Sequence, residues 1–281
     1  MAEVSAKDVA ALRKVTGAGM MDCKKALEEN DGDQEAAKDW LRTKGLAGAS
    51  KRAGRTAEQG TVDVIFDDKV AALVELTCET DFVAKGADFV GTVAALTRQV
   101  AEQGDAGLPQ QAFEGSTVEE YVTQLSAKLG EKIELGRVVR YETTDALLDG
   151  YKHIQNDRGT IGVLVELAGV DPADPTAREI AHDLALHIAS AAPRYVRRED
   201  VPDDAIEKER ELLTELTRNE GKPENAIEKI VAGRIQGFYK DYVLLEQGFV
   251  RDPKVTIRAL LDGLGADAVV RRFTRVKVGE E

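Results

Sequence analysis

One short segment combines residue types that suit a binding turn: Thr77-Cys-Glu-Thr-Asp-Phe-Val-Ala-Lys-Gly-Ala-Asp-Phe89. An apolar strand precedes it, and Thr80 and Asp81 are both good caps for the first turn of a helix. The large apolar Phe82 therefore stands at the start of a short helical turn. Two interpretations stay open: Phe82 points outward as a contact residue, or it packs into the core while Thr80 or Asp81 only caps the turn.

The sequence signatures of catalysis are missing from this chain. It has no Gly-x4-Gly-Lys-Ser/Thr loop, no His-Glu-x-x-His, no Cys-x-x-Cys and no Gly-x-Ser-x-Gly. The run Gly263-Leu-Gly-Ala-Asp-Ala268 has dinucleotide-binding spacing, but a helical pattern precedes it where a strand is required, so we expect a helix-ending turn. His182 and His187 are five positions apart, which places them on different faces of a helix and not on one face as shared metal ligation would need, and we expect His187 in or near the core. We therefore expect no enzyme activity, no metal and no cofactor.

The charge balance bears on the class of ligand. The 281 residues include 38 Lys and Arg against 51 Asp and Glu, a net charge of −13 that repels phosphate backbones and anionic lipid. Direct binding of nucleic acid or membrane is disfavoured, and no run approaches the ~18 apolar residues of a membrane span. The amino terminus lacks an export signal, and we expect Cys23 and Cys78 to be reduced thiols, which together predict a cytoplasmic protein.

Residues 1 to about 45 are predicted to form three helices, because apolar residues recur at spacings of three and four. Ser5 and Asp8 resemble a capping box at the start of the first helix. The third helix is expected to close at Gly45, and the small, basic segment 46–55 is expected to be a linker that is partly helical at most. The second helix is expected to place four residues on one face: Met20, Cys23, Ala26 and Leu27.

Beyond the linker the pattern repeats itself. Two strands and then a helix are predicted at 61–64, 70–76 and 89–100, and the same order returns at 151–155, 161–167 and 180–188. Leu-Val-Glu-Leu occurs in both copies, about 90 residues apart, which indicates a duplicated α+β unit. We therefore predict a core of two antiparallel-sheet subdomains, at residues 56–145 and 146–281.

The second half contains two further features. Residues from about 202 to 247 are helical and highly charged, with a break at Gly221-Lys222-Pro223, which predicts an antiparallel helical hairpin projecting from the body. Such a hairpin is most simply a solvated arm. Residues 269–278 alternate apolar and basic side chains, which is typical of an outer strand of the second sheet.

Two runs of residues resemble a known family. Leu12-Arg-Lys-Val-Thr-Gly-Ala-Gly-Met-Met-Asp-Cys-Lys-Lys-Ala-Leu27 and Thr80-Asp-Phe-Val-Ala-Lys85 are similar to bacterial translation elongation factor Ts, and the resemblance extends over essentially the whole chain. It implies a ubiquitin-associated-like domain over residues 1–55, followed by the two-subdomain core with its hairpin. It also implies a guanine-nucleotide exchange factor for the GTPase elongation factor Tu, which displaces phosphate-loop and magnesium contacts and releases GDP.

The resemblance also implies roles for individual residues. Asp81 and Phe82, with Thr80 and Val83 beside them, match a pair that intrudes near the magnesium site of the GTPase, and His153 matches a residue that approaches its nucleotide side. Two further sets match contact surfaces of the amino-terminal domain and of the second subdomain respectively: Arg13, Met20, Met21 and Lys24, and Val250 and Arg251.

Several alternatives accompany these assignments. At least one of Met20 and Met21 is equally well explained as a filler of the three-helix core, because Met suits both roles. Some members carry Met in place of Arg251, and some continue past the last strand into a further helix. The hairpin has either self-association, giving a homodimer, or partner contact as its family role. A chaperone that holds a nucleotide-free GTPase, and an adaptor for ubiquitin-like folds, are competing functions.

Overall fold

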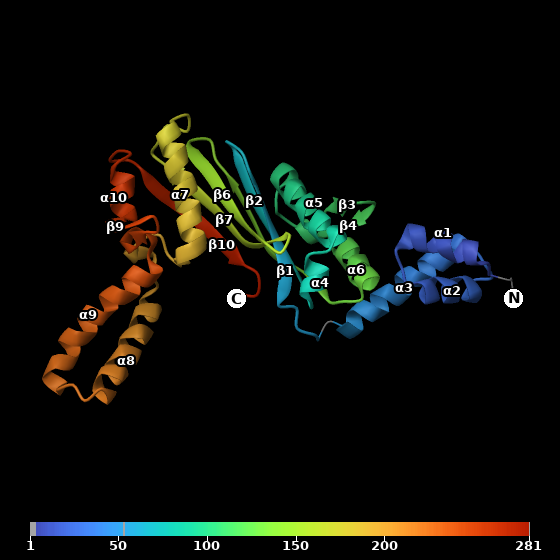
Figure 1. Cartoon of the computed structure of the whole chain (residues 1–281), viewed down its shortest axis with the longest axis horizontal. Coiled ribbons are helices and arrows are strands. Elements are labelled where there is room, and N and C mark those ends of the chain that lie inside the picture. The colour runs from blue at the N-terminus through green and yellow to red at the C-terminus, as the bar shows by residue number, and fades with distance from the viewer. Residues whose placement is uncertain (1–3, 53, 281) are drawn as a thin grey trace.

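The computed structural model describes residues 4–52 and 54–280, and Figure 1 shows a mixed fold of helices and antiparallel sheets with a helical region at the amino end. Short 3-10 turns lie at residues 108–110, 198–200 and 244–246. The helices are α1 Ala6–Thr16, α2 Met20–Glu29, α3 Gln34–Arg52, α4 Asp81–Ala84, α5 Ala87–Gln103, α6 Val118–Leu129, α7 Pro175–Ala191, α8 Asp203–Asn219, α9 Glu224–Tyr242 and α10 Ile257–Asp262. The strands are β1 Gln59–Phe66, β2 Val70–Cys78, β3 Ala112–Phe113, β4 Ser116–Thr117, β5 Ile133–Glu142, β6 Ala146–Gln155, β7 Arg158–Ala168, β8 Gly248–Phe249, β9 Asp252–Thr256 and β10 Val269–Lys277.

The three amino-terminal helices pack around a small core of their own. The predicted capping box is confirmed, since the Asp8 amide donates to the Ser5 hydroxyl at 3.2 Å while the Asp8 carboxylate accepts from the Ser5 amide. Of the four residues predicted on one face of α2, Cys23, Ala26 and Leu27 are buried, whereas Met20 is 59% exposed. It is the first residue of the helix and lies along a groove beside α1, at the margin of the cluster. The buried residues of that cluster are Val9, Leu12, Cys23, Ala26, Leu27 and Ala37.

The prediction that the third helix closes at Gly45 is wrong, because α3 continues without a break to Arg52. The helix is stabilised by docking on α6. A Cβ at Gly45 would lie 2.8 Å from the Cβ of Ala127, so the glycine permits a close approach of the two helices. Near the end of α3, the Arg52 guanidinium donates to the Ser126 carbonyl at 3.2 Å. In Figure 1, α3 therefore leads from the amino-terminal helices to the body as one long helix.

Two three-stranded antiparallel sheets form the body. Their strand orders are β1-β2-β5 and β10-β7-β6. Each sheet consists of a hairpin, β1–β2 or β6–β7, and a third strand that pairs with the second strand of that hairpin. A helix, α5 or α7, follows each hairpin in the chain, so the repeated order of elements predicted from the sequence is present. The domain limits at 1–55, 56–145 and 146–281 stay predictions.

The two sheets pack face to face, with helices on their outer faces (Figure 1). In β2, Leu73 joins the cluster between the sheets, while Val74 and Leu76 belong to the cluster under α5. In β7, Leu164 faces the other sheet, and Val163 packs toward α7. Because both faces of these strands are buried, their sequences are almost continuously apolar where a half-exposed strand would alternate.

The Leu-Val-Glu-Leu repeat buries one glutamate in each sheet. Glu166 is 1% exposed and accepts from Arg271 and Arg272 at 2.7 and 2.6 Å, so its charge is paired. Glu75 is 7% exposed and accepts from the Arg137 amide at 3.2 Å. Burial raises the pKa of Glu75, and the Arg137 amide and charge only partly oppose that effect.

The carboxy-terminal features agree with their predictions. Helices α8 and α9 pair as a hairpin that projects from the body in Figure 1, around a small core of Ile227, Val231 and Ile235. Strand β10 lies at the edge of its sheet, and the segment after α10 is a turn. Across residues 4–52 and 54–280, no helix has the length and apolar character needed to cross a membrane.

The buried carboxyl of Glu75 makes stability depend on pH. Below its ordinary pKa of 4.5 the carboxyl is neutral in both states, and as the pH rises the unfolded chain releases this proton before the folded chain does. Stability therefore falls from that pH until the folded carboxyl is also ionised.

We expect Glu75→Gln, which keeps an acceptor for Arg137, to remove this loss. The free energy of unfolding of the variant should therefore rise relative to that of the wild type between acidic and neutral pH. Urea unfolding across that range measures the difference. Glu102→Gln, at an exposed site on α5, is the control, and equal pH profiles for wild type and Glu75→Gln would contradict the expectation.

A second prediction concerns the amino-terminal helices. Removal of residues 1–55 uncovers the face of α6 that α3 contacts but leaves both sheet cores whole, so we expect a cooperative unfolding transition with a loss of roughly 1–3 kcal/mol. Urea denaturation followed by circular dichroism measures this loss. A truncated chain without a cooperative transition would show that the body depends on α3 for its fold.

Candidate functional site

Phe82 lies outside the core, on the one-turn helix α4 between β2 and α5. Its side chain is 75% exposed, more than any other large apolar side chain of the described residues. The Lys85 ammonium lies 4.5 Å from the ring centre and pairs with the Asp81 carboxylate at 3.4 Å. The interpretation that Phe82 packs into the core is therefore wrong, and the turn presents an aromatic ring beside a carboxylate.

The outward position of Phe82 follows from the residues that the turn buries. Ala84 is fully buried and Val83 packs against the cluster under α5, so the opposite side of this single turn faces solvent. The Thr61 hydroxyl donates to the Ala84 carbonyl at 2.6 Å, which ties the end of the turn to β1. At the start, the Thr80 hydroxyl accepts from the Val83 amide at 3.4 Å, as expected of an N-cap.

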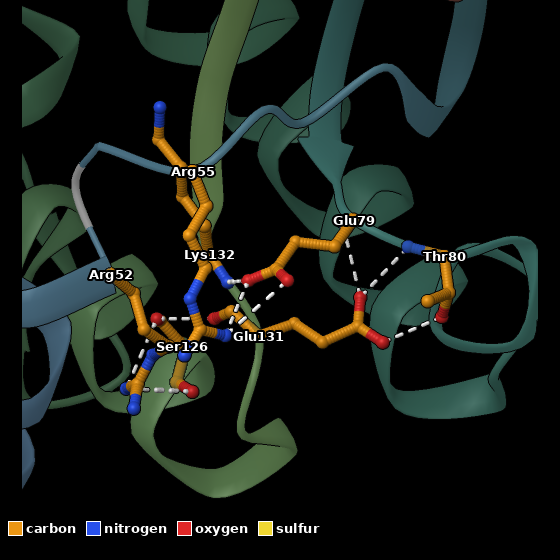
Figure 2. Close-up of polar contacts among 7 residues, drawn as sticks. All are labelled: Arg52, Arg55, Glu79, Thr80, Ser126, Glu131 and Lys132. Atoms are coloured by element: carbon orange, nitrogen blue, oxygen red, sulfur yellow. Dashed lines mark hydrogen bonds and ion pairs between the residues drawn. The ribbon is translucent and has the colours of Figure 1, made fainter.

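A polar cluster beneath the turn was not predicted from the sequence (Figure 2). Glu131, which follows α6, accepts from the amides of Glu79 and Thr80 and from the Thr80 hydroxyl. Glu79 in turn accepts from the Lys132 amide at 2.6 Å and from Arg55 at 3.2 Å. These contacts lower the pKa of Glu79, the Lys132 amide more than Arg55. No motif marks Glu131, because it is 51 residues away from Thr80 in the chain.

Cys78, immediately before this turn, is not a candidate nucleophile. Its thiol is fully buried and donates to the Thr80 carbonyl at 3.3 Å. Burial, with a smaller contribution from the nearby Glu131 charge, raises the pKa of Cys78 to about 12. The thiol is therefore protonated at neutral pH, and its contact with Thr80 is structural. As predicted, Cys23 and Cys78 are both free cysteines.

The amino-terminal candidates gather around one groove between α1 and α2. Arg13, Met20, Met21 and Lys24 all line it, together with apolar side chains that include Val9. Met20 and Met21 are 59% and 74% exposed, so neither fills the three-helix core and that alternative is wrong. The groove combines exposed methionines with two basic side chains, a composition suited to an adaptable protein contact.

The remaining candidates lie elsewhere on the body. His153 is exposed on β6, where its Nδ1 is 3.0 Å from the Tyr151 hydroxyl. Val250 is 46% exposed in the turn between β8 and β9, and its amide donates to Nδ1 of His187 at 3.2 Å. The neighbouring Arg251 pairs with Asp183 at 2.8 Å.

His187 is buried, as predicted, and supports the turn that carries Val250. Its Nε2 is 2.9 Å from the Gln247 side-chain oxygen, and its Nδ1 accepts the Val250 amide. Burial lowers the pKa of His187, although the contact with Gln247 opposes the effect. A neutral ring that accepts at Nδ1 and donates at Nε2 satisfies both contacts.

The candidates form separate surfaces along the molecule. In Figure 1 helices α1 and α2 lie toward the amino end, α4 lies near the middle, and β9 lies at the other side of the body. A partner that contacts all of them must be large. Throughout the parts of the chain that the structure describes, no group of three or more His, Cys, Asp or Glu side chains is arranged to hold a metal ion.

Comparison with known proteins gives a consistent result. The family model described as "Elongation factor TS" matches residues 79–280. An elongation factor Ts from Symbiobacterium thermophilum is 47% identical over an alignment 293 residues long, which covers 100% of this chain and 93% of that protein. Proteins of the same name from Streptomyces avermitilis and Aquifex aeolicus are 46% and 42% identical, and the matches cover 99% and 98% of this chain and 100% and 98% of those proteins.

The exposure of Phe82 leads to a prediction about stability. Phe82→Ala removes a ring that the core does not use, so we expect the free energy of unfolding to change by no more than about 0.5 kcal/mol. Phe89, seven residues further along and fully buried, provides the matched control, and Phe89→Ala should cost about 3–5 kcal/mol. Chemical denaturation of both variants tests this contrast, and equal losses would show that Phe82 contributes to the core.

Proposed function

This chain belongs to the elongation factor Ts family, and from that premise we propose that it is a guanine-nucleotide exchange factor that binds elongation factor Tu and releases its GDP. The observation that carries the proposal is the turn at Asp81 and Phe82, where an aromatic ring 75% exposed stands beside a carboxylate on a supported one-turn helix. The cytoplasm, where translation takes place, is the proposed location.

Release of GDP requires no covalent step. A GTPase holds GDP through backbone amides of its phosphate loop and through Mg²⁺. A second protein can bind the conformation of the GTPase in which these groups are displaced. It then lowers the affinity of the GTPase for GDP, and GDP lowers the affinity of the GTPase for that protein by the same factor. In this proposal Phe82 enters between helices of the GTPase and Asp81 acts near its magnesium site. The chain then acts as a binding protein, without a nucleophile, an acid or a base of its own.

The size of the effect argues for a broad interface. Burial of one phenylalanine contributes about 1.5–3 kcal/mol, which corresponds to one or two decades in affinity. Burial of Phe82 alone is therefore too weak to displace a tightly bound nucleotide, and other contacts between the two proteins must add to it. The groove of Arg13, Met20, Met21 and Lys24 and the turn of Val250 and Arg251 are the proposed anchors, with His153 facing the nucleotide side. Together they would form an interface of roughly 2,000 Å² or more.

Two further assignments remain predictions. The net charge of −13 supports a protein partner over nucleic acid or a membrane surface. The helical hairpin carries exposed Leu212 and Leu216 on α8, which supports the predicted role in self-association or in partner contact.

Release of a fluorescent GDP from elongation factor Tu tests the proposed function directly. With this protein present at a substoichiometric concentration, we expect several molecules of GDP to be released per molecule of protein. Phe82→Ala and Asp81→Ala should each slow the release, the former by roughly ten- to a hundredfold from the lost burial of the ring. Phe66→Ala, at a partly exposed phenylalanine on β1, is the control and should retain the wild-type rate.

Two results would count against this proposal. Release limited to one equivalent of GDP would indicate the chaperone that holds a nucleotide-free GTPase. Wild-type rates in both the Asp81 and the Phe82 variants would show that the exposed turn takes no part in exchange.

A further inference from the structure

The polar cluster beneath α4 begins where the β2–β5 ladder ends. Cys78 and Ile133 are the last paired residues of that ladder. In the same register, Glu79 would face Lys132 and Thr80 would face Glu131. Backbone pairing stops at this point, and the amides of Glu79 and Thr80 turn toward a side chain instead.

Glu131 satisfies both of these amides with one carboxylate. Its Oε2 accepts from the Glu79 amide at 3.1 Å and from the Thr80 amide at 3.0 Å. Its Oε1 accepts from the Thr80 hydroxyl at 2.5 Å. Hydrogen bonds to a charged acceptor are stronger than neutral ones, so this carboxylate supports the chain where it leaves the sheet.

The contact with the Thr80 hydroxyl extends to α4 itself. Because the hydroxyl hydrogen points to Glu131, the lone pairs of the oxygen are free for the Val83 amide, which donates at 3.4 Å. Glu131 therefore orients the N-cap of the helix whose first two residues are Asp81 and Phe82. It reaches the exposed pair through Thr80 and is not one of the exposed residues itself.

Glu131 is held in place from two sides. The Ser126 hydroxyl donates to the Glu131 carbonyl at 2.5 Å, and the Arg52 guanidinium donates to the Ser126 carbonyl at 3.2 Å. On the other side, the Glu79 carboxylate accepts from the Lys132 amide (Figure 2). The segments 79–80 and 131–132 thus each use a glutamate side chain to bind the backbone of the other. The end of α3, the end of α6 and the turn before α4 thus form one connected unit.

We propose that Glu131 is a positioning residue for the Asp81–Phe82 turn, which it holds in the outward conformation that acts on the GTPase. This inference rests on the proposed exchange function. The essential observation is that one partly buried carboxylate binds three donors from Glu79 and Thr80 and sets the cap of α4. Loss of the carboxylate should loosen the start of the turn while both sheet cores stay intact.

Glu131→Gln is the most informative variant, because an amide keeps the size of the side chain but loses one of its two acceptor atoms. Amide hydrogen exchange reads its effect without any partner. We expect the amides of Glu79, Thr80 and Val83 to exchange about tenfold faster, while those of β2 and β5 keep their protection. Glu134→Gln, at an exposed glutamate three positions further on, should change none of the three. Unchanged protection of the three amides in Glu131→Gln would overturn the proposal.

GDP release then tests whether the support acts through the turn. We expect Glu131→Gln to lower the second-order rate constant of catalysed release by about tenfold, and Thr80→Val, which deletes the connecting hydroxyl, to do the same. Added to the double variant Asp81→Ala/Phe82→Ala, Glu131→Gln should cost less than about twofold, because the residues it positions are already gone. Equal losses in the two backgrounds would show a general structural effect and overturn the proposal.

The two readouts separate this inference from the function on which it rests. If the wild-type protein fails to accelerate GDP release, the exchange function is refuted, and the hydrogen-exchange result still decides whether Glu131 holds the turn. If the wild type is active but Glu131→Gln exchanges GDP at the wild-type rate, Glu131 is not a positioning residue although the exchange function stands.

Discussion

The structure depends on the face-to-face packing of two three-stranded sheets. Val62, Leu73 and Leu164 meet between them, and a Cβ at Gly162 would lie 2.8 Å from atoms of Val62 and Leu73. This close approach buries the inner face of each sheet. The outer faces are apolar as well, so each needs a cover, and α5 with α6 and α7 provide it. The four layers of the body, in the order helix, sheet, sheet, helix, follow from the packing of the two sheets against each other.

The exposed turn is held both by this core and by the Glu131 carboxylate. Val83 and Ala84 anchor α4 in the cluster under α5, and the end of β2 holds the residues immediately before it. Phe82 is thus presented to solvent by a segment whose other side chains are committed to the interior. An exposed aromatic ring on a mobile loop would lose more entropy on binding than one on a turn that is already ordered. Rigidity of the support therefore favours the binding role proposed for the turn.

Buried charges are handled differently in the two copies of the repeated sequence. Glu166 has two arginine partners, and Arg272 also stacks 4.0 Å above the ring of Tyr141, which joins the two sheets. Glu75 accepts from a backbone amide, and its pKa rises with burial. Copies of one local pattern thus acquire distinct electrostatic environments, because the partners of each glutamate come from strands that differ in sequence.

The sequence by itself determined the features that depend on neighbouring residues. The capping box of Ser5 and Asp8, the strands of both hairpins and the break at Gly221 between α8 and α9 were all predicted, since caps, alternation and turns are local. The exposure of Phe82 and of Met20 was decided by tertiary structure, because it depends on which side chains fill the nearby core. Docking on α6 likewise extended α3 past Gly45 to Arg52, and Glu131 came to Thr80 only through the pairing of β2 with β5. Contacts between residues distant in the chain leave no periodic signal in either segment, so only the folded structure decided them.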